Sequence, residues 1–127
     1  MTRALLQDWL DLEGVGNSEV LQSGSRWPNL DGYQDVTFWL EVRLQTPGTE
    51  LRMSYQTAPV GEPALFTNMT GDILMTTATG TVPIITPVRQ AGNPLVPLSG
   101  LVRWRISAIS GGAWKTSFRI HYVAKRR

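Results

Sequence analysis

Residues 36–45 alternate between two kinds of side chain, and this alternation constrains the fold more than any other feature of the chain. A period of two places one set of side chains on each face of a β-strand. One face would carry only apolar side chains: Val36, Phe38, Leu40, Val42 and Leu44. The other would carry polar side chains and a tryptophan: Thr37, Trp39, Glu41, Arg43 and Gln45. We therefore expect a strand with one face in a hydrophobic core, from which Trp39 points away.

Two pairs of alternating segments are joined by short turns, which predicts two β-hairpins. The first pair, 36–45 and 50–57, is joined by Thr46-Pro47-Gly48-Thr49, in which proline and glycine suit a tight turn. The second pair, 101–109 and 115–123, is joined through Ser110-Gly111-Gly112-Ala113. The second pair would bury one face of each strand: Val102, Trp104, Ile106, Ala108, Thr116, Phe118, Ile120 and Tyr122.

The middle of the chain contains three shorter segments of strand-like composition, 64–67, 73–77 and 81–89. Pro83 and Pro87 cannot donate hydrogen bonds to a neighbouring strand, so we expect the third segment to be an edge strand or an extended loop. Residues 93–97, with two prolines, are expected to be a connector.

The first 26 residues fit more than one structure. Five side chains would share one stripe of a helix: Leu5, Leu6, Trp9, Leu10 and Leu12. As a strand, the same segment would alternate from Leu6 to Leu12. We favour a strand or an irregular arm, because Thr, Gly and Trp are abundant in the residues after this segment, and we expect a further short strand at 19–25.

About eight short strands, without a strongly amphipathic helix, are typical of an all-β domain. The 127 residues suffice for one domain with a sizeable core. We therefore predict a single antiparallel two-sheet β-sandwich or jelly roll over residues 1–127. Residues 1–18 would form an irregular N-terminal arm, and residues 124–127 a short basic tail.

The composition excludes several kinds of chemistry. The chain has no cysteine, which rules out disulfides, thiolate catalysis and cysteine-bound metal. No apolar run approaches the ~20 residues that cross a bilayer, and the N-terminus lacks the pattern of a signal peptide, so we expect no membrane partner. The net charge is only +2, and the one basic run is Lys125 to Arg127, so we do not expect a nucleic-acid partner.

Few residues could carry catalysis. His121 is the only histidine, and it lies in the middle of a predicted strand without a carboxylate nearby in the sequence. The G-x-S-x-G and phosphate-loop motifs are absent. Asp31, Asp35 and Glu41 could offer oxygen ligands to calcium, but their spacing matches no EF-hand loop and suits turn-forming carboxylates better. We therefore expect no enzymatic activity, no cofactor and no bound metal.

The polar face of the second predicted hairpin is unusually basic. A turn at residue 112 would bring four basic residues together in two pairs: Arg105 with Arg119, and Arg103 with His121. Like charges directly opposite each other destabilise a sheet. Either the side chains splay apart in solvent, or carboxylates offset them, from Glu41 and Glu50 or from a partner.

Tryptophans add apolar surface to this candidate interface. Trp9 begins the hexad WLDLEG, which recurs as WPNLDG from Trp27, although Trp27 itself is expected to be a rim or core anchor. Arginine and tryptophan are enriched at the anchors of protein interfaces, although ordinary core packing and composition bias are the more common reason for their abundance. The candidate partner-binding residues are Trp9, Trp39, Arg103, Arg105, Arg119 and His121.

Five parts of the chain form one larger pattern: residues 27–42, 55–59, Phe66, 102–107 and 118–120. Together they resemble small β-sandwich accessory proteins of tailed-phage particles, some of which are similar in layout to discoidin or galactose-binding jelly rolls. The resemblance implies a non-enzymatic virion component, such as a capsid decoration or minor head protein, made in the host cytoplasm. It also implies self-association into a homo-oligomer and docking onto a major capsid protein or another virion protein, and it assigns no site residue.

The sequence therefore supports two main hypotheses about function. In the first, it is a structural β-sandwich that binds a protein lattice through its N-terminal arm, outward tryptophans and basic face. In the second, it is a carbohydrate-binding module in which exposed aromatic side chains stack on sugars, with Trp27, Trp39 and Trp114 as candidates. An enzyme is a third class, which the scarcity of catalytic residues makes the weakest of the three.

Overall fold

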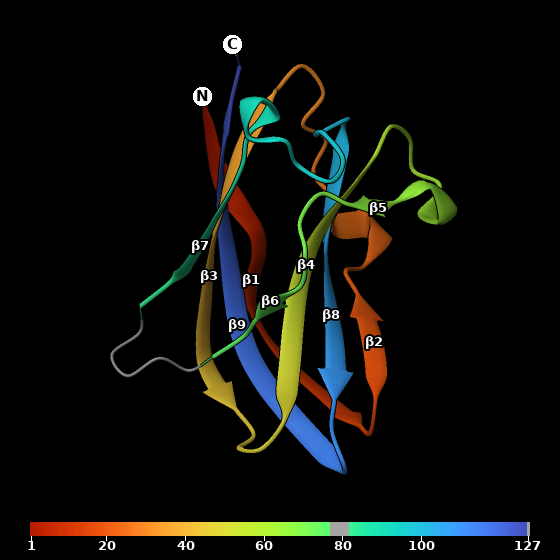
Figure 1. The fold of residues 1–127 in the computed structure, drawn as a ribbon, viewed down its shortest axis with the longest axis vertical. Helices are drawn as coiled ribbons and strands as arrows, with labels where there is room; N and C mark the ends of the chain where they lie inside the picture. The colour runs from red at the N-terminus through yellow and green to blue at the C-terminus, as the bar shows by residue number, and fades with distance from the viewer. Residues whose placement is uncertain (77–81, 127) are drawn as a thin grey trace.

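The computed structural model describes residues 1–76 and 82–126, which fold into two β-sheets packed face to face (Figure 1). Three short 3-10 turns interrupt the strands, at Gly24–Arg26, Pro63–Leu65 and Gln90–Gly92. The described residues contain no helix long and apolar enough to cross a membrane. The strands are β1 (Thr2–Val15), β2 (Ser18–Leu21), β3 (Asp35–Gln45), β4 (Glu50–Ala58), β5 (Thr67–Asn68), β6 (Ile73–Leu74), β7 (Ile84–Val88), β8 (Leu101–Ile109) and β9 (Ala113–Lys125).

The strand order is that of a jelly roll. Sheet A has the order β1-β9-β3-β7, and sheet B has the order β2-β8-β4-β5, with β6 also paired to β4. Every described pair is antiparallel. Because β5 and β6 pair with different parts of β4, they occupy one strand position, which leaves the eight positions of a two-sheet jelly roll. The predicted all-β antiparallel sandwich is confirmed.

Both predicted hairpins are wrong, although the strands themselves exist. β3 and β4 belong to different sheets, and so do β8 and β9. The short segments at 46–49 and 110–112 therefore cross from one sheet to the other. A hairpin and such a crossing share one sequence pattern, because in both cases two alternating strands turn their apolar faces toward the same core.

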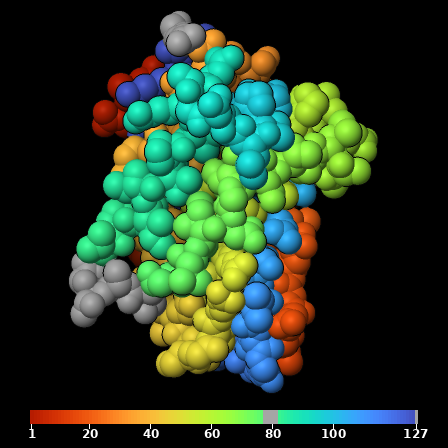
Figure 2. Space-filling model, in the orientation of Figure 1, coloured from red at the N-terminus to blue at the C-terminus, as the bar shows by residue number. Residues whose placement is uncertain are grey.

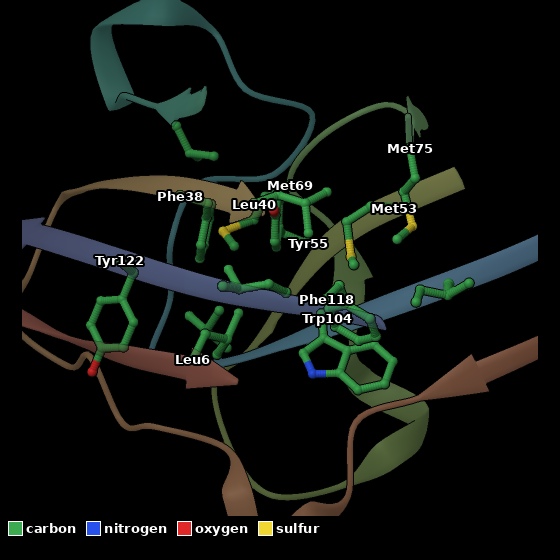
Figure 3. Close-up of a cluster of buried hydrophobic side chains, with 14 of the residues drawn as sticks. Leu6, Phe38, Leu40, Met53, Tyr55, Met69, Met75, Trp104, Phe118 and Tyr122 are labelled. Atoms are coloured by element: carbon green, nitrogen blue, oxygen red, sulfur yellow. The ribbon is translucent and has the colours of Figure 1, made fainter. Parts of the chain in front are cut away.

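The core lies between the two sheets and is built largely from the predicted apolar faces (Figure 3). Phe38 of β3 stacks on Tyr55 of β4 with ring centroids 3.8 Å apart. Trp104 of β8 meets Phe118 of β9 edge to face at 5.1 Å. These aromatic pairs join the sheets, and each adds roughly 0.5–1.5 kcal/mol beyond the burial of its area.

The apolar face of β3 is buried as predicted from Val36 to Val42, but Leu44 is 56% exposed. The pairing of β3 with β9 shifts register between Val42 and Leu44. Such a bulge adds a residue to one strand, which rotates the side chains beyond it. The alternation in the sequence therefore continues past the bulge, but the side chains beyond the bulge point to the opposite face of the sheet, which leaves Leu44 exposed.

The N-terminal segment forms a strand rather than a helix or an irregular arm. β1 pairs with β9 from Thr2 to Val15 at the edge of sheet A, with two register shifts between Leu5 and Leu10. Leu6 is buried in the core, and Leu10 and Leu12 pack against it. Pairing with β9 therefore decides the ambiguity that the leucine pattern left open.

The middle of the chain is shorter in strand than expected. Only Thr67–Asn68 and Ile73–Leu74 form strands of the first two predicted segments, and part of 64–67 lies in a 3-10 turn. β7 is an edge strand with Pro87 opposite Thr37, as predicted from the prolines of segment 81–89. Thr77 and Thr81, the ends of two predicted segments, lie outside the described residues.

Three further predicted segments, 19–25, 93–97 and 124–127, agree with the structure to different degrees. The predicted strand at 19–25 is observed as β2, which is already complete at Leu21. Residues 93–97 are a connector without strand, as expected. Of the predicted basic tail at 124–127, Ala124 and Lys125 belong to β9, and Arg127 lies outside the described residues.

Candidate interaction surface

A row of side chains crosses the outer face of sheet A. Ile85 of β7 lies opposite Trp39 of β3, Trp39 lies opposite His121 of β9, and His121 lies opposite Leu5 of β1. Ile85 is 54% exposed and Leu5 is 43% exposed, while Trp39 and His121 are half-buried. We call these four residues the Trp39 row. Trp39 points away from the core, as predicted.

Two hollows lie on either side of Trp39. One of about 600 Å³ extends along Leu5, His121 and Glu41 to Pro83. The other, of about 430 Å³, is lined by Met1, Thr37, Ile85, Pro87, Arg89 and Lys125. Arg3, Trp39 and Val123 line both hollows. The indole therefore divides a shallow apolar surface that spans all four strands of sheet A.

Below the row, Arg119 is neutralised by Glu41 across the strand pair. Nη2 of Arg119 lies 2.8 Å and 3.1 Å from the two carboxylate oxygens of Glu41. Nε2 of His121 lies 3.1 Å from Oε1 of the same carboxylate. The guanidinium groups of Arg43 and Arg119 lie 4.1 Å and 4.7 Å from the centroid of the Trp9 ring. Contacts of this kind contribute up to about 1 kcal/mol each at partly exposed sites.

Three cations beside the hollows have no such partner. Arg3, Arg89 and Lys125 are exposed, and within the described residues none of them lies within 4.0 Å of a carboxylate. Asp35 shares the rim with Arg89 and Lys125 and accepts a hydrogen bond from the Gln90 backbone N–H at 3.1 Å. The rim of the row is therefore positively charged.

Arg103 and Arg105 do not belong to this surface, because β8 lies in sheet B. Arg103 is opposite Gln56, and Arg105 is opposite Ser54. The predicted cross-strand pairs with Arg119 and His121 are therefore wrong, and the cluster of four basic residues does not form. The second predicted hairpin is wrong for the same reason: β8 and β9 belong to different sheets and face each other through the core instead of lying side by side.

Arg105 forms an ion pair with Glu19 on the outer face of sheet B. Nε and Nη2 of Arg105 each lie 3.1 Å from a carboxylate oxygen of Glu19. The hydrogen bond between them raises the pKa of Arg105 and lowers the pKa of Glu19. Next to them, Arg52 lies 3.0 Å from Glu50 and 3.9 Å from Asp72. The charges of this face are thus largely satisfied within the chain.

Arg103 is a buried structural residue. It is only 5% exposed, its Nε donates to Oε1 of Gln56 at 2.7 Å, and burial lowers its pKa. Its guanidinium lies 4.1 Å from the Phe66 ring centroid and 5.6 Å from that of Trp27. Trp27 packs on Phe66 with centroids 4.6 Å apart, which makes it the anchor that the sequence predicted.

Other candidate residues are also separated by the fold. Trp114 is 1% exposed and lies in the core, so it offers no platform for a sugar. The two W-x-x-L-[DE]-G hexads adopt different structures, one in strand β1 and one in a loop. Over residues 1–76 and 82–126, no group of three or more His, Asp or Glu side chains is placed to hold a metal.

The sequence did not single out Leu5, Ile85, Arg3 and Arg89 as parts of a site. They lie on β1, on β7 and in the residue directly after β7, and these two strands form opposite edges of sheet A. The only available signal was the mixture of apolar and basic residues in segments expected at an edge. Which of them meet Trp39 depends on strand order, which alternation does not encode.

Comparison with known proteins supports the fold and leaves the family open. No protein-family model matches the chain, and no curated protein matches it. Similar solved structures include infectious bursal disease virus, Gx strain (TM-score 0.56, 11% identity, 95% of this chain and 32% of that chain). The Gt strain gives 0.55, 9%, 95% and 30%, and the VP2 subviral particle of the same virus gives 0.54, 12%, 95% and 31%.

These structural neighbours are chains of infectious bursal disease virus structures, one of them its VP2 subviral particle, and the chain shares their two-sheet β-fold. The chain spans about a third of the length of the proteins that it matches, for which the covered shares are 32%, 30% and 31%. At identities of 9–12%, the likeness concerns the fold alone.

Proposed function

We propose that this protein is a non-enzymatic structural component of a virus particle that acts through protein–protein contacts on the outer face of sheet A. The observation that carries the proposal is the exposed Trp39 row on a jelly roll whose structural neighbours are capsid proteins. Within this class, we propose a decoration or minor head component of a tailed-phage particle, docked on the major capsid protein.

We favour sheet A over sheet B as the binding face because the charged side chains on the two outer faces differ in how many of them are paired within the chain. On sheet B, Arg105 is paired with Glu19 and Arg52 with Glu50. On sheet A, a partly exposed row that includes a tryptophan lies beside three cations that have no carboxylate partner among the described residues. Exposed apolar patches with a polar rim mark interaction sites, and tryptophan and arginine are enriched among the residues that dominate binding.

Co-sedimentation with particles that lack this protein tests the proposal. The wild-type chain should pellet with the particles, and Trp39→Ala should remain in the supernatant. Ile109→Ala is the matched control, because Ile109 is an exposed apolar residue of sheet B at 45% exposure. The proposal is contradicted if the wild-type chain does not pellet with the particles, or if the Trp39→Ala variant pellets like wild type.

A carbohydrate-binding module is the second candidate, and one observation favours it. Trp39 lines the 600 Å³ hollow together with the polar side chains of Glu41, His121 and Arg3. Sugar sites combine an aromatic surface with a few polar groups that set orientation. A glycan array should then show binding that Trp39→Ala abolishes, and a wild-type chain that binds no glycan removes this candidate.

A further inference from the structure

The loop between β4 and β5 forms a protrusion with an apolar surface. All residues from 59 to 65 are exposed, and the loop stands out from the body of the molecule at the upper right of Figure 2. Val60 is 52% exposed and Leu65 is 48% exposed. Glu62 lies between them and, among the described residues, makes no ion pair. We call residues 59–65 the β4–β5 loop.

This loop is held in shape before any partner binds. Pro59 and Pro63 restrict its backbone, and Pro63–Leu65 forms a 3-10 turn in which the Leu65 N–H donates to the Glu62 carbonyl at 3.0 Å. Phe66, at the end of the loop, is 8% exposed and packs on Trp27 and Arg103. A preordered protrusion loses little conformational entropy on docking, which favours binding.

The Trp39 row has the complementary chemistry. Its two hollows have apolar walls, and Arg3, Arg89 and Lys125 stand at their rims without carboxylate partners among the described residues. The carboxylate of Glu41 already accepts two hydrogen bonds from Arg119 and lies 3.1 Å from Nε2 of His121, so it does not offset these cations. The row therefore fits an occupant with bulky apolar side chains and an acidic group between them.

We infer that the occupant is the β4–β5 loop of a second copy of this chain. Val60 and Leu65 of one copy would pack against Trp39 and the walls of the hollows of the next, and Glu62 would meet Arg3. This inference rests on the proposed function, because it names the contact by which such a structural protein would associate with itself, while the copy at the end of an assembly keeps its row free for the particle. Charge complementarity and the exposed apolar residues on both surfaces are the observations that carry it.

The contact joins two different surfaces, which has a consequence for assembly. The loop extends from sheet B, whereas the row lies on the outer face of sheet A. A single head-to-tail contact of this kind leaves one loop and one row free, so further copies can add until the assembly closes into a ring or grows as an open filament. Association should therefore continue beyond a dimer as the protein concentration rises.

Sedimentation velocity and light scattering from about 5 to about 500 μM measure the association, a range that covers contacts of low affinity. The wild-type mass should rise with concentration beyond that of a dimer. Trp39→Ala and Leu65→Ser should each stay monomeric, with Ile85→Ser as a second row variant because Ile85 is more exposed than Trp39. Val15→Ser, at a residue that is 75% exposed and lies at the opposite end of β1 from Arg3 and Leu5, should associate like wild type.

A mixture of two variants gives the sharpest test. Trp39→Ala retains an intact loop, and the double variant Leu65→Ser, Glu62→Lys retains an intact row. Each alone should be monomeric, and an equimolar mixture should form a one-to-one complex that grows no further. A reversed pair of charges, Arg3→Glu mixed with Glu62→Arg, should restore association that each single change weakens.

Three results would overturn the inference. A wild-type chain that is monomeric over the whole range overturns it directly. Variants that associate normally despite a native circular dichroism spectrum, or a mixture in which no complex forms while wild type associates, show that other surfaces make the contact. Particle co-sedimentation tests the proposed function and not the self-association. A monomeric wild type that pellets with particles through Trp39 leaves the proposed function standing and shows that the row docks on a different virion protein.

Discussion

Trp39 shows what a single residue can reveal from sequence alone. Its position among alternating apolar residues predicts that it points away from the core, and the structure confirms this direction. Its neighbours Ile85 and His121 come from other strands, through pairing that the sequence does not specify. Its role as a binding residue remains a prediction, which particle co-sedimentation and the association measurements test.

Tyr55 gives a prediction about stability. Its side chain is fully buried, burial raises its pKa, and its hydroxyl has no hydrogen-bond partner among the described residues. A buried hydroxyl without a partner costs about 1–3 kcal/mol. Tyr55→Phe should therefore raise the free energy of unfolding by about 1 kcal/mol in urea denaturation, while keeping the stacking on Phe38.

Tyr33→Phe is the control for this change, because the hydroxyl of Tyr33 hydrogen-bonds to the hydroxyl of Thr2. It should leave stability unchanged or lower it. If Tyr55→Phe lowers the free energy of unfolding, the Tyr55 hydroxyl has a partner and the prediction is wrong.

Glu19 gives a prediction about pH. Its hydrogen bond with Arg105 lowers its pKa in the folded state below the ordinary value of 4.5. A lowered carboxyl pKa stabilises the folded state above the unfolded-state pKa, and this stability is lost as the pH falls through the folded-state pKa. Between about pH 6 and about pH 3, wild type should therefore lose more unfolding free energy than Glu19→Gln does.

Denaturant titrations at several pH values compare the two curves. Glu13→Gln serves as a control, because it removes a more exposed ion pair, 3.5 Å from Lys115 with Glu13 71% exposed. Parallel curves for wild type and Glu19→Gln would contradict the prediction.

At the scale of elements, the contact between β1 and β9 depends on a glycine. Gly14 lies opposite Trp114, and a Cβ atom at Gly14 would meet the indole at 2.5 Å from Cε2. Trp114 is 1% exposed and has no room to move away. Gly14→Ala should destabilise the protein by about 1–3 kcal/mol through overpacking, measured by chemical denaturation.

Gly111→Ala is the matched variant for Gly14→Ala. A Cβ atom at Gly111 meets nothing within 4 Å, so its effect should stay within about 0.5 kcal/mol. Equal effects of the two changes would show that the cost arises from backbone conformation rather than from the indole.

The elements also show how far pattern reasoning extends. The spans of β3, β4, β8 and β9, and most of their buried faces, follow from alternation. Their partners do not, because a strand that buries one face satisfies the same pattern beside any neighbour in either sheet. Arg105 shows the error that arises when strand partners are not known: it was predicted to face Arg119 and instead pairs with Glu19.

At the scale of the molecule, the jelly roll joins the two ends of the chain. Thr2 pairs with Ala124, so β1 completes its contacts only when β9 is present, and Figure 1 shows the termini side by side. Folds dominated by contacts distant in sequence fold slowly, because loop closure must precede the stabilising contacts. Refolding in stopped-flow experiments should therefore take milliseconds to seconds.

Tryptophan fluorescence and far-ultraviolet circular dichroism should report the same refolding rate, because both sheets share one core. Refolding in microseconds would contradict the expected dominance of distant pairings. A clear separation of the two signals would show that one sheet forms before the other.

The sequence by itself determined that the chain is all-β, which faces of β3, β4, β8 and β9 for the most part enter the core, and that Trp39 lies outside it. Each of these follows from the direction of alternate side chains along one strand, a local property of the backbone. Only the tertiary structure decided that consecutive strands cross between sheets and that Arg103 is buried. It also decided that Leu5, Trp39, Ile85 and His121 form one row. These features depend on which strands pair, and many pairings satisfy the same hydrophobic pattern until the whole core is packed.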